Sequence, residues 1–376
     1  MKTLASWTLL LSLLVSFITG CAKKTDEILI GEFGTLSGND ASFGQSTNKG
    51  IRMAFDEINS AGGIKGKKLK LITYDNQGKP DESAAVVKRL ITQDKVLAIL
   101  GEVASQRSLA AAPIAQQYKV PMISPSSTSP KVTQVGDYIF RICFIDPFQG
   151  SVMARFMTEH LKLKKVAILR DVKNEYSVGL ADVFAKVATE KGAEILLDVS
   201  YQAGDIDFKS QLTQIKSKNP EAIFIPGYYG EVGLITSQAR QLGIKAVFLG
   251  GDGWENNSLS EIAKDSANGS YFSNHYSTDS TDPKTQDFIQ RFKDKYGETP
   301  DSMAALGYDA AKILAQAIER TTEISPENIR SEIAKTKDFV GVTGKITIDG
   351  DRNAAKPAVI VQVEGNQRKF VTSIAP

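Results

Sequence analysis

From residue 28 onward, short apolar runs rich in β-branched residues alternate with longer amphipathic stretches. This alternation is typical of βαβ units, in which helices connect parallel strands. In the first half, strands are expected at residues 28–33, 70–74, 96–100 and 121–124. The helices between them are expected to begin near Gln45, Asp81 and Gln106.

A second series of the same kind follows. Its strands are expected at residues 165–169, 194–199, 222–225 and 246–249, with helices beginning near Phe148, Val178, Phe208 and Glu231. Two helical stretches, 287–296 and 303–321, come late, and strand-like runs follow at 345–348 and 358–363. Two such series predict an α/β protein with two doubly wound parallel sheets side by side.

The first 27 residues have a different character. Lys2 precedes an apolar run over residues 4–18, which is shorter than the roughly 20 residues of a membrane span and typical of a secretory signal. Ile18-Thr19-Gly20-Cys21 resembles a bacterial lipobox, which implies lipidation of Cys21. We expect a lipoprotein signal peptide over 1–20 and a tether over 21–27. An ordinary signal peptide with an incidental cysteine is the alternative.

Charge and composition exclude several classes of protein. The 45 Lys and Arg residues nearly balance the 43 Asp and Glu residues, so the strong basic bias of a nucleic-acid-binding protein is absent. Two histidines and two cysteines provide almost no ligands for a zinc site of the usual type. We therefore expect no nucleic-acid partner, no metal and no cofactor.

Polar and aromatic side chains gather in the loops after the predicted strands, where doubly wound sheets bind ligands. These residues are Ser105, Ser126, Ser127, Thr128, Tyr176, Tyr228, Tyr229, Asp252 and Trp254. Hydroxyl groups beside helix N–H groups suit a carboxylate, and a lone acid among tyrosines suits an ammonium group. The alternative is that the hydroxyls only cap helices and the aromatics only fill the core.

Several segments together resemble one family. They are Gly31-Glu32-Phe33-Gly34-Thr35-Leu36-Ser37-Gly38, Asn59-Ser60-Ala61-Gly62-Gly63-Ile64-Lys65-Gly66, Pro121-Met122-Ile123-Ser124-Pro125-Ser126-Ser127-Thr128-Ser129-Pro130, Pro226-Gly227-Tyr228-Tyr229-Gly230-Glu231 and Gly250-Gly251-Asp252-Gly253-Trp254. From residue 28 to the end the chain resembles the branched-chain amino-acid-type substrate-binding lipoproteins of ABC transporters. These are type I periplasmic binding proteins of the leucine/isoleucine/valine-binding family.

The resemblance implies a fold of two doubly wound lobes joined by a three-segment hinge. The first lobe would comprise residues 28–145 and 277–340, and the second lobe residues 146–276 and 341–376. The chain would cross between the lobes near 144–147, 275–277 and 339–344. The late helices would return to the first lobe and the tail strands to the second.

The resemblance also implies a ligand site. Ser105, Ser126 and Thr128 would hold the carboxylate of an amino acid, and Asp252 on the other lobe would hold its ammonium group. Further positions are aromatic: Phe43 would cover the ligand, Tyr176 and Tyr228 would line the cleft, and Tyr229 and Trp254 are expected to narrow the side-chain pocket. No catalytic residue and no metal ligand is implied.

The implied function is extracytoplasmic capture of an amino acid, branched-chain or aliphatic, and its delivery to an ABC permease. The protein would be a monomer in the bacterial cell envelope, facing the periplasm or the exterior and reaching the membrane through a lipid anchor only. Asp252 stands where many relatives have Glu, so an amide or an aromatic acid stays open as ligand. Gly78 and Ala104 stand where several relatives carry a disulfide. A ligand-sensing lipoprotein that serves a partner receptor is a further alternative.

An enzyme is the competing class. Ser46 and Lys49 have the Ser-x-x-Lys spacing of some serine hydrolases, but the companion motifs are missing. His160 stands at the expected end of a helix, where it can interact with the helix dipole. His275 stands near an implied crossing and is expected to have a hinge or surface role. We therefore expect that the protein is not an enzyme.

Overall fold

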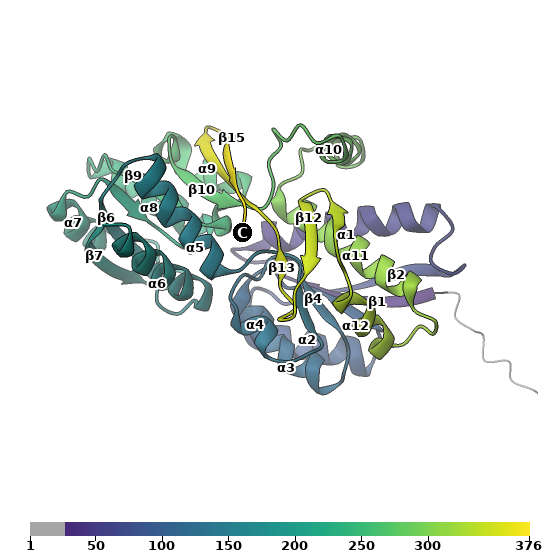
Figure 1. The fold of residues 1–376 in the computed structure, drawn as a ribbon. Helices are drawn as coiled ribbons and strands as arrows, with labels where there is room; N and C mark the ends of the chain where they lie inside the picture. The colour runs from purple at the N-terminus through teal and green to yellow at the C-terminus, as the bar shows by residue number, and fades with distance from the viewer. Residues whose placement is uncertain (1–26) are drawn as a thin grey trace, which may run out of the picture.

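The computed structural model describes residues 27–376, and it consists of two α/β lobes connected through the middle of the molecule (Figure 1). In the first lobe five parallel strands have the order β2-β1-β3-β4-β5. The strands are β1 (Glu27–Gly34), β2 (Lys68–Asp75), β3 (Ala98–Leu100), β4 (Met122–Ser124) and β5 (Ile139–Arg141). The helices among them are α1 (Ala41–Ser60), α2 (Pro80–Thr92), α3 (Ser105–Gln117) and α4 (Lys131–Gln134).

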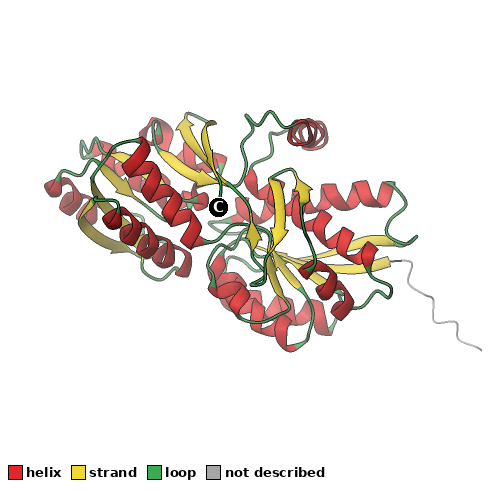
Figure 2. Cartoon of the chain, in the orientation of Figure 1, coloured by secondary structure: helices red, strands yellow, loops and turns green. Residues whose placement is uncertain are grey.

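Alternating residues of β1 build two apolar layers in this lobe. Ile28 and Ile30 face the layer that holds α1, whereas Leu29 and Phe33 join the layer that holds α2 and α3. A strand that is apolar on both faces fits a sheet covered by helices on both sides, which Figure 2 also shows.

The second lobe contains a seven-stranded sheet in the order β15-β14-β10-β9-β8-β6-β7. Its strands are β6 (Lys165–Asp171), β7 (Glu194–Tyr201), β8 (Ala222–Phe224), β9 (Val247–Gly250), β10 (Tyr271–Asn274), β14 (Ala358–Glu364) and β15 (Gln367–Ile374). The last two are antiparallel additions at one edge. The helices are α5 (Asp146–Arg155), α6 (Glu175–Glu190), α7 (Lys209–Lys218), α8 (Tyr229–Gln241) and α9 (Asn257–Ala263). The two predicted α/β series are thus confirmed.

After β10 the chain returns to the first lobe through α10 (Pro283–Tyr296), α11 (Ser302–Arg320) and α12 (Pro326–Ala334). Helix α11 lies against α1, and glycines make the close approach possible. A Cβ atom at Gly50 would lie 1.9 Å from the carbonyl oxygen of Ala304, and one at Gly307 would lie 2.5 Å from that of Thr47. The two helices could not pack in this way with larger residues at these positions.

The third crossing lies later than the family resemblance implied. Strands β11 (Phe339–Gly341), β12 (Gly344–Ile348) and β13 (Ala354–Ala355) form a separate small sheet. Ile346, Ile348 and Ala354 belong to the core of the first lobe, so the expectation that residues 341–376 all belong to the second lobe is corrected. The chain crosses between β13 and β14, at residues 356–357. A strand pattern alone does not show which sheet the strand joins.

No helix within residues 27–376 is both long and apolar enough to cross a membrane. The expected signal peptide and the lipidation site at Cys21 lie outside the described residues.

Candidate ligand site between the lobes

A narrow cavity lies between the lobes. Both sheets point the carboxyl ends of their strands toward it, where ligand sites of doubly wound sheets are found. Its lining is Phe43, Val103, Ser105, Ser126, Thr128, Tyr176, Tyr228, Asp252, Gly253 and Met303. The seven residues that we expected to contact a ligand are therefore gathered around one cavity. Val103, Gly253 and Met303 were not anticipated.

The first lobe contributes hydroxyl groups to this cavity. Ser105 begins α3, and its Oγ accepts a hydrogen bond of 3.1 Å from the backbone N–H of Ser129. The buried hydroxyl of Ser126 has no hydrogen-bond partner among the described residues. An unpaired buried hydroxyl is costly, and the N-terminus of a helix favours an anion. This side of the cavity therefore suits an anionic group that accepts hydrogen bonds.

The second lobe contributes one carboxylate. Asp252 lies in a short 3₁₀ turn after β9 and is almost fully buried. Its Oδ1 accepts from Nε2 of Gln149 at 2.9 Å, and its Oδ2 lies 2.9 Å from Nε2 of His275. These bonds fix the orientation of a buried acid at the cavity wall, opposite the hydroxyls, so the cavity has chemically different ends.

His275 is buried, with 1% of its surface exposed, which corrects the expectation of a surface role. Its ring stacks on Phe144 with the centroids 3.8 Å apart. Burial lowers the pKa of His275, although the neighbouring Asp252 acts in the opposite direction. Sequence reasoning placed His275 near a crossing but gave no signal that it contacts Asp252, because 23 positions separate the two residues.

Three aromatic rings form a continuous wall. Tyr176 and Tyr228 of the second lobe stack with centroids 5.4 Å apart, and Phe43 of the first lobe meets Tyr228 edge-on at 5.7 Å. The hydroxyl of Tyr176 accepts a hydrogen bond of 3.1 Å from the N–H of Gly253. Burial raises the pKa of both tyrosines, so they act as neutral phenols. The wall offers an apolar surface to a ligand side chain.

Tyr229 and Trp254 do not line the cavity, contrary to expectation. Trp254 is fully buried in the core of the second lobe, where its indole N–H donates to the carbonyl of Ile225 at 2.8 Å. Tyr229 packs edge-on against Phe43, and its hydroxyl donates to the carbonyl of Asn39. Tyr229 thus connects the lobes beside the cavity.

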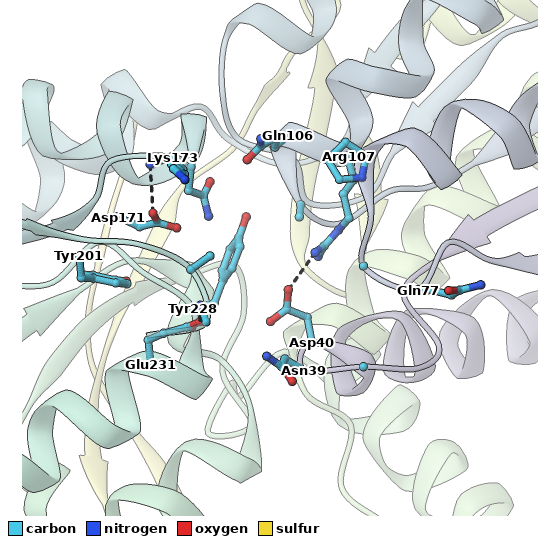
Figure 3. Close-up of a pocket in the computed structure, with 17 residues that line it drawn as sticks. Asn39, Asp40, Gln77, Gln106, Arg107, Asp171, Lys173, Tyr201, Tyr228 and Glu231 are labelled. Atoms are coloured by element: carbon cyan, nitrogen blue, oxygen red, sulfur yellow. Dashed lines mark hydrogen bonds and ion pairs between the residues drawn. The ribbon is translucent and has the colours of Figure 1, made fainter. Parts of the chain in front are cut away.

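A larger cleft, with about 1250 Å³ of atom-free space, lies outside the inner cavity. Tyr228 borders both spaces, and Figure 3 shows its ring between the two lobes, near Arg107 and Asp40. Arg107 is buried and pairs with Asp40 at 2.8 Å and with Glu102 at 3.1 Å. Although burial opposes its charge, Glu102 and Asp40 raise the pKa of Arg107. The sequence carried no motif for this cluster.

A family model described as a periplasmic binding protein matches residues 27–368. The chain belongs to the periplasmic binding protein family. A leucine-, isoleucine-, valine-, threonine- and alanine-binding protein of Pseudomonas aeruginosa is 31% identical over 329 residues, which cover 87% of each chain. The family consists of substrate-binding proteins, which bind solutes.

Two solved structures of this kind are similar over nearly their whole length. A leucine-binding protein of Thermotoga maritima is 40% identical with a TM-score of 0.89, covering 93% of this chain and 99% of its own. The isoleucine complex of a branched-chain amino acid transporter substrate-binding protein of Streptococcus pneumoniae is 36% identical with the same TM-score. It covers 93% of this chain and 100% of its own. Both similarities confirm the fold.

The described residues contain no group of three or more His, Cys, Asp or Glu side chains that could hold a metal ion. The polar groups of the cavity are hydroxyls and one acid, and the rest of its lining is aromatic or apolar, which suits an organic ligand with two opposite charges.

Proposed function

We propose that this periplasmic binding protein captures an aliphatic α-amino acid between its lobes and delivers it to an ABC importer. The carboxylate of the amino acid is held by Ser105, Ser126 and Thr128. The ammonium group is held by Asp252. Phe43, Tyr176 and Tyr228 cover the side chain.

One observation carries the proposal: the unpaired hydroxyl of Ser126 and the clamped carboxylate of Asp252 border the same cavity but belong to different lobes. An α-amino acid has a carboxylate for the hydroxyl of Ser126 and an ammonium group for the carboxylate of Asp252. Because each charged end would be bound by a different lobe, the ligand stabilises the closed form relative to the open form. The closed form is then what the permease recognises.

Relatives support the class of ligand. The Pseudomonas, Thermotoga and Streptococcus proteins carry names for binding leucine or branched-chain amino acids. In this chain, Val103, Met303 and Phe43 provide apolar surface in the same cavity. Burial of an aliphatic side chain there would contribute about 1.5–3 kcal/mol.

We further propose that the protein is a monomer that a lipid on Cys21 tethers to the cell envelope, facing the periplasm or the exterior, and that it is not an enzyme. The lipobox-like Ile18-Thr19-Gly20-Cys21 supports the tether. Radiolabelled fatty acid should enter the wild-type protein in a bacterial host but not a Cys21→Ala variant.

Calorimetric titration with the twenty L-amino acids tests the proposed ligand. The protein is first unfolded and refolded to remove any ligand that copurifies. We expect the strongest binding for Leu, Ile or Val. Binding of other amino acids only would revise the side-chain pocket, whereas no binding across the panel would contradict the proposal and favour an amide or aromatic acid ligand.

A further inference from the structure

The carboxylate of Asp252 is clamped from two sides inside the second lobe. Gln149 holds one side through a pair of bonds: its Oε1 accepts from the backbone N–H of Asp252 at 3.0 Å, and its Nε2 donates to Oδ1 at 2.9 Å. Because Oε1 also lies 3.0 Å from the hydroxyl of Ser273, the orientation of the amide is determined. The second carboxylate oxygen, Oδ2, contacts His275. Each carboxylate oxygen can accept more than one hydrogen bond, so the ammonium group of a ligand can still bind Asp252.

The contact determines which nitrogen of His275 carries the proton. An ionised carboxylate can only accept, so Nε2 of the imidazole must be the donor in the 2.9 Å contact. Nδ1 is buried and has no hydrogen-bond partner among the described residues. The neutral ring with its proton on Nε2 satisfies both observations, and the lowered pKa that burial causes agrees with a neutral ring.

The imidazole is held in place by the segments that cross between the lobes. His275 directly follows β10, and its backbone N–H donates to Oδ1 of Asn274 at 2.8 Å. Its ring stacks on Phe144, which lies in the crossing segment between β5 and α5, at an interplanar angle of 25°. Both rings are almost fully buried. The proton donor to Asp252 therefore has little freedom to turn away.

We propose that His275 is a positioning residue for ligand recognition: its Nε2–H holds the carboxylate of Asp252 in the orientation that faces the ammonium group of the ligand. This inference rests on the proposed function. His275 itself does not line the cavity, so it acts through Asp252. Without the imidazole, Oδ2 would be a buried acceptor with no donor among the described residues, and the carboxylate would be free to rotate.

Two substitutions separate positioning from a merely structural role. His275→Leu removes the donor, and we expect it to weaken L-leucine binding about tenfold or more, which corresponds to the loss of one hydrogen bond to a charged group. His275→Gln offers an amide N–H close to the former Nε2 and should recover most of the affinity. His160→Leu is the matched control, because His160 is exposed and does not line the cavity, and it should leave the affinity unchanged.

These binding measurements distinguish a failure of the positioning role of His275 from a failure of the proposed function. If the wild-type protein binds leucine and His275→Leu binds it equally well, the positioning role is wrong while the function stands. Equal losses in His275→Leu and His275→Gln would also overturn it, because a structural role alone predicts no rescue. If the wild-type protein binds no amino acid, the proposed function fails first.

A second measurement does not depend on the folding of any His275 variant. Because the chain has only two histidines, nitrogen NMR of the wild-type protein can assign both imidazoles, with His160→Gln identifying the other set of signals. We expect His275 to carry its proton on Nε2 and to stay neutral near pH 7. A proton on Nδ1 of a neutral ring would contradict the inference, since Nε2 could not then donate to Asp252.

Discussion

The hydroxyl of Tyr229 in the second lobe donates a hydrogen bond of 2.8 Å to the carbonyl oxygen of Asn39 in the first lobe. Because this bond joins the two lobes, their opening would break it, and it lies beside Phe43, which packs against the same tyrosine. It therefore contributes to the free energy of closure without touching the ligand cavity.

Tyr229→Phe should remove this bond and leave the ring packing intact. Loss of one neutral hydrogen bond corresponds to about 0.5–1.5 kcal/mol. We therefore expect calorimetry to show a ligand affinity that is weaker by about two- to tenfold. Tyr118→Phe on the exposed surface is the control, and its affinity should match the wild type. If Tyr229→Phe also matches the wild type, the bond does not contribute to closure.

Asp252 should contribute more to the free energy of ligand binding than Ser105 does. Asp252→Asn keeps the shape of the side chain but leaves a buried ammonium group without its counter-charge, which should weaken leucine binding by about 3 kcal/mol or more. Ser105→Ala should cost only about 1 kcal/mol, because the N–H groups of α3 and the other hydroxyls remain. Titration of both variants tests the ranking, and similar losses would contradict it.

A glycine beside Asp252 should be intolerant of a methyl group. A Cβ atom at Gly251 would lie 2.3 Å from Oε1 of Gln149 and 2.4 Å from the hydroxyl of Tyr176. Gly251→Ala should therefore displace the side chains that orient the site. We expect it to weaken ligand binding about tenfold, which corresponds to the loss of one hydrogen bond to a charged group. Gly230→Ala meets no atom within 4 Å and should bind normally. Wild-type affinity in Gly251→Ala would show that this contact has no role.

Closure of the two lobes should be coupled to the uptake of one proton. Glu255 of the second lobe accepts a hydrogen bond from the backbone N–H of Ser302 in the first lobe at 3.3 Å. Burial raises the pKa of Glu255 from 4.5 to about 7, with Asp301 adding to the rise and Arg368 opposing it. If opening of the lobes exposes the carboxyl, its pKa returns toward 4.5. Between these values closing takes up a proton, so binding strengthens as the pH falls through 7 and levels off near 4.5.

Titrations near pH 6, about halfway through that window, in buffers of different ionisation enthalpy measure this proton uptake. We expect uptake by the wild-type protein and none by Glu255→Gln. Glu32→Gln is the control: burial also raises the pKa of Glu32 to about 7, but its partners Asn48 and Thr73 lie in the same lobe. Unchanged uptake in Glu255→Gln would assign the proton to another group.

The sequence allowed the α/β lobes to be predicted because their central strands are apolar on both faces and their helices are amphipathic. Strands β5 and β10 escaped this reasoning although the equally short β3, β4, β8 and β9 were predicted. Polar residues end both missed strands, Arg141 in β5 and Ser273 and Asn274 in β10, so neither shows a continuous apolar run. Helix α12 was missed although Pro326 and the capping hydroxyl of Ser325 mark its start. Those two signals could have found it.

The site was predictable where its residues lie just beyond the carboxyl ends of predicted strands, as Ser105 and Asp252 do. Gln149 and His275 escaped because their roles depend on contacts across 103 and 23 positions of the chain. Trp254 was misassigned because an aromatic residue next to the site looks the same in sequence whether it faces the ligand or the core. Only the three-dimensional packing distinguishes the two.

The central claim is that the cavity recognises both charged ends of an α-amino acid. Titration of the wild-type protein with L-leucine, its des-amino analogue 4-methylpentanoate and leucinamide tests this directly. We predict that leucine binds tightly and that each analogue binds about a hundredfold more weakly, since each leaves buried polar groups unpaired. Equal affinity for 4-methylpentanoate would contradict the account, because Asp252 would then recognise no ammonium group.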